Sequence, residues 1–114
     1  MPCIQTKVSV KISKEKEQII KTKLGKAIEL IPGKSEEWLM LSFEDECHLY
    51  FKGSSQHGIA FVEVKLFGKA SNEAYDKLTA AITDILNQEL GISPSQIYVK
   101  YEEIAHWGWN GSNF

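Results

Sequence analysis

The sequence predicts an α+β fold in which four main strands form one sheet and two helices cover one of its faces. The order strand, helix, strand occurs twice along the 114 residues. Both helical segments carry apolar residues at helical spacing and end at proline or glycine. With 43% hydrophobic and 25% charged residues, the composition is typical of a globular protein. We therefore expect one domain that spans residues 1–114.

The chain begins with a predicted strand and a predicted helix. Side chains alternate over residues 3–10, and one face carries Ile4, Thr6, Val8 and Val10. This alternation is typical of a half-buried strand. Ser13 can cap a helix that Pro32 and Gly33 end. The apolar residues of this helix at helical spacing are Ile20, Leu24, Ala27 and Ile31.

The middle of the chain has the pattern of three strands. Residues 38–43 and 48–51 predict two short strands, separated by an acidic turn at residues 44–46. A loop opens at residues 53–55, where the sequence is Gly-Ser-Ser. A longer strand follows over residues 59–67, and its apolar face consists of Ala60, Val62, Val64 and Leu66.

The last third repeats the order of helix and strand. Ser71 can cap a helix that ends at Gly91 and carries the apolar residues Tyr75, Leu78, Ile82, Ile85 and Leu90. Ile97, Val99 and Tyr101 alternate in the strand that follows. In a strand-helix-strand unit the two strands are parallel and the crossover is nearly always right-handed. Both helices therefore lie on the same side of the sheet.

The other face of this sheet has no layer of its own in a chain of this length. Phe61 and Tyr98 lie on that face among polar neighbours. A partner subunit can cover such a surface, so we expect a homo-oligomer.

Composition excludes several function classes. The formal net charge of −2 comes from mixed signs along the chain, so we expect no nucleic-acid partner. No apolar run approaches the roughly 20 residues that span a bilayer, so we expect no membrane partner. Gln5, Lys7 and Lys11 stand where a signal peptide needs apolar residues, which predicts a cytoplasmic protein. Export by a route without a signal peptide stays open.

The two cysteines, Cys3 and Cys47, are far apart and have neither CxxC nor metal-ligand spacing. We therefore expect no disulfide framework and no metal site. Free cysteine usually packs as a small hydrophobic residue, so both thiols are expected to be buried.

Pro2 is the first candidate for chemistry. Removal of Met1, which is normal before a residue as small as proline, leaves a secondary amine at the chain end. An α-amino group titrates at about 7.7–8.0, and an apolar pocket or nearby cations lower that pKa. A neutral amine at pH 7 can act as a general base. Met-Pro is a common start, however, and an ordinary first strand is the alternative interpretation.

Six segments, in order, resemble the macrophage migration inhibitory factor family across essentially the whole chain. They are MPCIQTKVSV at the start, PGK at 32–34, GSS at 53–55, FGK at 67–69, GISPSQIYVKY from residue 91 and the ending GWNGSNF. The resemblance implies a tautomerase β-α-β-β-α-β fold with a four-stranded mixed sheet, assembled as a homotrimer with active sites between subunits. It implies keto-enol tautomerisation of phenylpyruvate-like 2-oxo acids and isomerisation of D-dopachrome, with Pro2 as base and acid and with no metal or organic cofactor.

The resemblance also assigns substrate-binding residues. Lys34 corresponds to the family's substrate lysine, although a lysine after a helix-ending glycine is otherwise usually only solvated. Phe67 stands where the family has an isoleucine whose backbone contacts substrate. Tyr98 matches a tyrosine that enters the pocket from the neighbouring subunit, with a core tyrosine as the alternative.

Aromatic residues complete the implied pocket. Trp38 falls where a family aromatic lines the pocket mouth, and Trp109 and Phe114 fall in the family's C-terminal tail. For these three, packing at the trimer interface is an equal alternative.

The sequence also departs from the family pattern. Lys100 replaces a pocket asparagine and is expected to add a second cation near the site. Trp107 replaces a smaller residue and is expected to narrow the pocket. The CxxC of some vertebrate members is absent, so we predict no thiol-disulfide activity. A cytokine-like protein that binds a receptor is the alternative to an enzyme.

Overall fold

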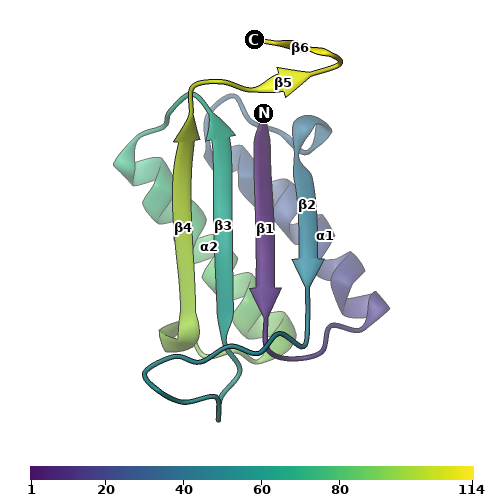
Figure 1. Ribbon diagram of the computed structural model, residues 1–114, viewed down its shortest axis with the longest axis vertical. Coiled ribbons are helices and arrows are strands. Elements are labelled where there is room, and N and C mark those ends of the chain that lie inside the picture. The colour runs from purple at the N-terminus through teal and green to yellow at the C-terminus, as the bar shows by residue number, and fades with distance from the viewer.

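The computed structural model describes residues 1–114 and consists of a four-stranded sheet with two helices on one face (Figure 1). The strands of the sheet are β1 (Pro2–Val8), β2 (Met40–Glu44), β3 (Ala60–Phe67) and β4 (Ile97–Ile104). The helices are α1 (Lys14–Ala27) and α2 (Asn72–Leu90). The 3-10 turns η1 (Ile28–Leu30) and η2 (Glu36–Trp38) lie between α1 and β2, and η3 (Pro94–Gln96) lies between α2 and β4. The chain ends in a small hairpin of β5 (Gly108–Trp109) and β6 (Ser112–Asn113).

The sheet is mixed, with strand order β2-β1-β3-β4. Strand β1 is parallel to β2 and antiparallel to β3, and β3 is parallel to β4. Each parallel pair is joined across a helix, as the repeated strand-helix-strand order predicts. The predicted four-stranded sheet with both helices on one face is thus confirmed.

The core lies between the sheet and the two helices. It is one cluster of 17 buried residues, to which β1 and β3 contribute alternate side chains. These side chains include Ile4, Val8, Ala60, Val62, Val64 and Leu66. Burial of every second residue along β1 and β3 is the period-two pattern that the sequence predicted for half-buried strands.

Both helix starts and the end of α2 follow the predicted capping residues, whereas α1 ends at Ala27 and passes into the 3-10 turn η1, before the predicted end at Pro32 and Gly33. The Ser13 hydroxyl accepts from the Lys16 N–H and the Ser71 hydroxyl from the Ala74 N–H, both at 3.1 Å. Helix α2 ends at Gly91, whose φ of 69° is left-handed. Both N-caps and this C-cap are confirmed.

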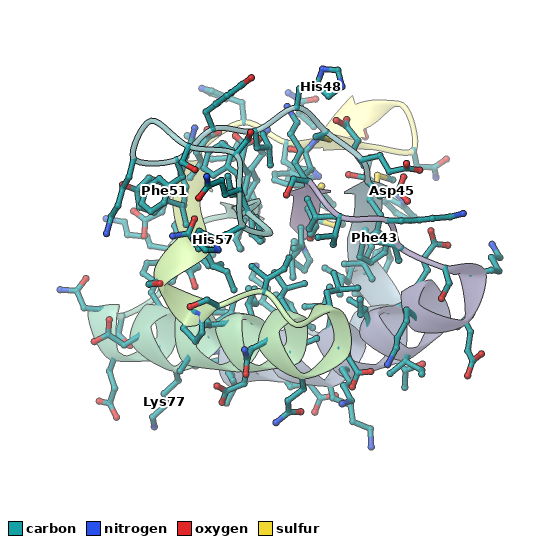
Figure 2. All side chains as sticks on the ribbon, turned by 90° about the horizontal axis from the view of Figure 1, so that it is seen from below. Phe43, Asp45, His48, Phe51, His57 and Lys77 are labelled. Carbon is teal, nitrogen blue, oxygen red and sulfur yellow. The ribbon has the colours of Figure 1, made fainter.

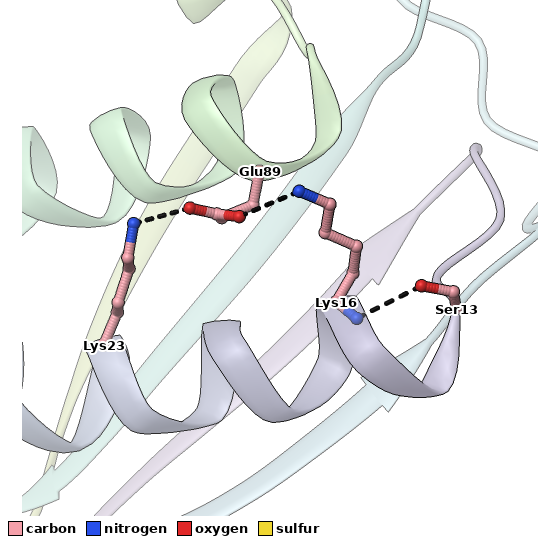
Figure 3. A network of polar contacts seen from close by, with 4 residues as sticks. All are labelled: Ser13, Lys16, Lys23 and Glu89. Carbon is pink, nitrogen blue, oxygen red and sulfur yellow. Dashed lines mark hydrogen bonds and ion pairs between the residues drawn. The ribbon is translucent and has the colours of Figure 1, made fainter.

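One carboxylate ties the two helices together. Glu89 of α2 contacts the Lys16 ammonium of α1 at 3.1 Å and the Lys23 ammonium at 2.5 Å (Figure 3). The Glu89 side chain is only 11% exposed, so this pairing takes place partly out of water. The two lysines hold the pKa of Glu89 below its ordinary value, with the Lys23 hydrogen bond as the largest cause.

The predicted strand at residues 48–51 is wrong. The only pairing there is an isolated bridge between Phe51 and Ser54, closed by a tight turn in which Lys52 and Gly53 have φ of 54° and 74°. This segment belongs to the loop between β2 and β3. Figure 2 shows its residues His48 and Phe51 on the side of the sheet away from the helix layer.

Two other expectations need correction. The second strand begins at Met40 rather than at Trp38, because Glu36–Trp38 forms a 3-10 turn. Cys3 and Cys47 are free but half-buried rather than buried. Cys3 faces the open side of the sheet, and Cys47 lies in the loop after β2.

The face of the sheet opposite the helices is open within one chain (Figure 1). It carries polar and apolar side chains together, among them Tyr98, which is 62% exposed.

No helix has both the length and the apolar character needed to cross a membrane.

Candidate active site

Pro2 is buried at the beginning of β1, in the interior of the sheet rather than at its edge. It pairs with Leu66 of the neighbouring strand β3. The same end of the sheet carries the turn before β2 and the β5-β6 hairpin (Figure 1). Segments far apart in the sequence therefore meet around the N-terminus.

Backbone and side-chain groups converge on the bond between Met1 and Pro2. The Phe67 N–H donates to the Met1 carbonyl oxygen at 3.0 Å. The Lys34 ammonium donates to the Phe67 carbonyl oxygen at 3.1 Å. The Met1 carbonyl carbon is bonded to the Pro2 nitrogen. The position of the Met1 carbonyl oxygen therefore shows where an oxygen atom of a small molecule can lie when the molecule binds beside this nitrogen. Without Met1, the Phe67 N–H is free to donate to such an oxygen.

The environment of the chain end favours a neutral amine. The pKa of the Met1 amino group is lowered from 8.0 to about 6, mainly because burial disfavours the charged form and further because Lys34 is close. Lys34 is half-buried and has no carboxylate at ion-pair distance. Its charge is therefore available to an anionic ligand.

A cavity of about 860 Å³ opens beside Pro2 on the face of the sheet away from the helices. Cys3 and Lys65 contribute to its floor, and its walls include all three tryptophans of the chain, Trp38, Trp107 and Trp109. The volume lies within the usual range of about 300–1,000 Å³ for small-molecule sites. The aromatic walls suit an apolar or aromatic group.

The C-terminal hairpin places two aromatic side chains at the site. Trp109 packs edge-on against Trp38 with ring centroids 5.1 Å apart, and Phe114 packs against Phe67 at 5.6 Å. The hairpin turns at Asn110-Gly111, where both φ angles are positive. Two left-handed residues give the type of turn that matches the strand twist of a two-residue hairpin.

Five of the residues predicted from the sequence thus lie together with Pro2 in one chain: Lys34, Phe67, Trp38, Trp109 and Phe114. Trp107, predicted to narrow the pocket, also lines the cavity.

Tyr98 does not lie near Pro2 within one chain. Its partner on β3 is Phe61, which pairs with Lys7 of β1. Lys7 is five residues beyond Pro2, which corresponds to about 16 Å at the rise of a strand. The Tyr98 ring contacts Phe51 at 4.9 Å and is otherwise exposed.

Lys100 is also distant from Pro2 within one chain, and its charge is compensated. Its ammonium contacts the carboxylates of Glu102 at 2.9 Å and Glu63 at 3.3 Å. Glu102 and Glu63, in this order, raise the pKa of Lys100. Lys100 is therefore not the second cation beside Pro2 in this chain.

Two residues of the site were missed in the sequence. Lys65 lies in the cavity because its register partner on β1 is Cys3, the neighbour of Pro2. The Gln5 side chain also lines the cavity, and its amide oxygen is buried without a hydrogen-bond partner. Alternation along β3 places Lys65 on the open face, but only the pairing of β1 with β3 places it at Pro2.

No group of three or more histidine, cysteine, aspartate or glutamate side chains is arranged to hold a metal ion.

The comparison with protein families decides the assignment. Residues 1–114 match the family described as Macrophage migration inhibitory factor (MIF). The chain belongs to the macrophage migration inhibitory factor family. Membership of this family and of the tautomerase superfamily supports a tautomerase-like or a cytokine-like role. The sheet and helices described above are the tautomerase fold of the family.

Individual family members agree with this assignment. The macrophage migration inhibitory factor of Meriones unguiculatus is 33% identical over 87 residues, which are 72% of this chain and 72% of that protein. The crystal structure of Leishmania major MIF2 superposes with a TM-score of 0.92 at 33% identity and covers 100% of this chain and 97% of that chain. A homologue from Prochlorococcus marinus gives a TM-score of 0.88 at 28% identity, with 98% of both chains covered.

Proposed function

We propose that this chain is a cofactor-free keto-enol tautomerase, an isomerase that acts on phenylpyruvate-like 2-oxo acids and on dopachrome. Pro2 serves as general base and then as general acid once Met1 is removed. One observation carries the proposal. The Phe67 N–H holds the Met1 carbonyl oxygen beside the Pro2 nitrogen, next to the unpaired ammonium of Lys34.

The proposed reaction transfers one proton between carbon and oxygen. The neutral Pro2 amine takes a proton from C3 of the 2-oxo acid, the electron pair of the broken C–H bond forms a C2–C3 double bond, and the π pair of the C2 carbonyl moves onto its oxygen. The resulting enolate oxygen takes the proton back from the Pro2 ammonium. The Lys34 ammonium and the Phe67 N–H bind the carboxylate and stabilise the negative charge as it develops. The tryptophans provide the surface for the phenyl ring.

We also propose a homotrimer in which the site lies between subunits. The open sheet face and the exposure of Tyr98 support this assembly. In the trimer, Tyr98 of the partner subunit enters the cavity beside Pro2 and bounds the aromatic ring of the substrate. Lys100 of the partner subunit comes to the same cavity with its two carboxylate partners.

Covalent labelling of the amine tests the proposal. A neighbour with this fold, 18% identical and with a TM-score of 0.81, was crystallised after inactivation by 2-oxo-3-pentynoate. A neutral secondary amine can add through nitrogen to C4 of this reagent while its proton moves to C3, with no leaving group. We expect trimmed protein to gain the whole mass of the reagent on Pro2 and to lose its activity.

The same protein with Met1 retained is the control, because its Pro2 nitrogen is an amide without a basic lone pair. Its Met1 amine is also mostly neutral at pH 7 and lines the cavity, so any label is expected on Met1 and none on Pro2. A label on Lys34 or Cys3 instead of Pro2 would contradict the assignment of the base.

A cytokine-like role is the second candidate, favoured by the name of the relatives. Such a protein binds a receptor and does not need the Pro2 amine, so receptor binding would survive retention of Met1. The enzyme role places the protein in the cytoplasm, whereas the receptor role requires its export.

A further inference from the structure

The cavity beside Pro2 is lined by a cation, Lys65, that the mechanism above does not use. Lys65 lies on the open face of β3, one residue before the register partner of Pro2. It is half-buried and lines the cavity together with Cys3 and Trp107. Burial raises the pKa of the Cys3 thiol, and the charge of Lys65 opposes this rise. The positive charge of the Lys65 ammonium therefore influences groups at the floor of the cavity.

The charge of Lys65 is not compensated by an ion pair of its own. No carboxylate lies within ion-pair distance of Lys65. Its neighbour on β4, Glu102, makes its ion pair with Lys100 at 2.9 Å, and Lys65 acts on this carboxylate only as a weaker cause of its lowered pKa. Glu37 also lines the cavity, but it is exposed and therefore screened by water. Two unpaired ammonium groups, Lys34 and Lys65, thus lie near Pro2.

We propose that Lys65 is a second anion-binding residue of the Pro2 cavity and that it makes the site select 2-oxo acids with a second carboxylate. The 2-oxo acid end binds at Lys34 and the Phe67 N–H, and the distal carboxylate pairs with Lys65 between the tryptophan walls. This inference rests on the proposed function and names a substrate class for it.

A matched pair of ligands tests the selectivity without any need for turnover. In 5-methyl-2-oxohexanoate, the distal carboxylate of 2-oxoglutarate is replaced by an isopropyl group of the same shape. The three tryptophans line the cavity, so quenching of their fluorescence reports binding. We expect trimmed protein to bind 2-oxoglutarate about tenfold more tightly than the isostere, as a charge-assisted hydrogen bond provides.

Lys65→Met is expected to abolish this preference and to leave the affinity for the isostere unchanged. Lys7→Met is the matched control, because Lys7 lies on the same face of the sheet but outside the cavity. It should keep the preference. Lys65→Gln is a second variant, and thermal unfolding checks that each variant folds.

Equal binding of both ligands by the wild type, or a preference that survives Lys65→Met, would overturn this inference alone. Binding of neither ligand would overturn this inference, whereas the proposed function would be overturned separately by a trimmed protein that neither converts phenylpyruvate nor is labelled on Pro2.

Discussion

At the scale of single residues, the proposed chemistry depends on the groups that surround the Pro2 nitrogen. A secondary amine is a useful base at neutral pH only if its pKa is brought near the operating pH. Burial and Lys34 already lower the pKa of the Met1 amine to about 6. After removal of Met1, the amine lies at Pro2, which is itself buried. We expect the same two causes to act on the Pro2 nitrogen, the proposed base.

The pH dependence of kcat/KM follows from this environment. Below its pKa the Pro2 amine is protonated and cannot accept a proton, so activity rises with pH as the amine becomes neutral. We expect the midpoint to lie below the ordinary value of an α-amino group, because burial and Lys34 lower the pKa of the amine at this end of the chain. In Lys34→Met the midpoint should move upward. A wild-type midpoint at about 8, the ordinary value of an α-amino group, would contradict the role of the environment.

The ammonium of Lys34 should matter for catalysis and not for folding. A hydrogen bond to a charged group contributes about 1.5–3 kcal/mol, so Lys34→Ala should lower kcat/KM for phenylpyruvate roughly 10- to 100-fold. Lys69→Ala removes an exposed lysine nearby and is the control, with an expected change near zero. Equal rates for wild type and Lys34→Ala would remove Lys34 from the site.

At the scale of elements, the sequence pattern predicted those strands whose side chains alternate between the core and the open face. Alternation along residues 3–10 and 59–67 identified β1 and β3, because each strand has one face in the core. The segment 48–51 has a similar pattern but no neighbouring strand, so it remains a loop. Lys65 was missed for the corresponding reason, since its position at Pro2 depends on the register of two strands distant in sequence.

The resemblance to a family supplied what these patterns could not. Nothing in the spacing of residues 34 and 67 indicates that the Lys34 ammonium reaches the Phe67 carbonyl oxygen. Such a contact depends on how the turn after η1 meets the end of β3, which is a property of the tertiary fold.

The ion pair between the helices gives a prediction for stability. We expect Glu89→Gln to lower the urea midpoint at pH 7 more than Glu73→Gln, which removes an exposed pair with Lys77. Because the folded pKa of Glu89 lies below 4.5, its contribution is present above that pH and is lost as the pH falls through the folded pKa. The difference between wild type and Glu89→Gln should therefore shrink at pH 3. A constant difference would show that Glu89 acts through packing alone.

At the scale of the whole molecule, the proposed site takes residues from two subunits. The Pro2 end of the sheet holds the proposed base, the proposed anion-binding groups and the aromatic walls. Tyr98 lies at the other end of the same sheet, about 16 Å away along the strands. If Tyr98 acts at the site, it does so from a partner subunit.

Mixing two inactive proteins tests this shared site. One is wild type with Met1 retained, which has Tyr98 but no free Pro2 amine, and the other is trimmed Tyr98→Ala. In mixed trimers at equal amounts, about one quarter of the sites combine a free Pro2 with Tyr98. Activity after co-refolding should therefore exceed the mean of the two parents. A mixture with only the mean activity would mean that Tyr98 and Pro2 do not share a site.

The central claim is that the free Pro2 amine is the catalytic base. The most direct measurement is the enol-keto conversion of phenylpyruvate, followed by absorbance, with trimmed protein and with protein that retains Met1, each identified by intact mass. We predict activity in the trimmed form and a loss of at least about 100-fold when Met1 is retained, as expected for removal of a general base. Equal activity of the two forms would contradict the claim.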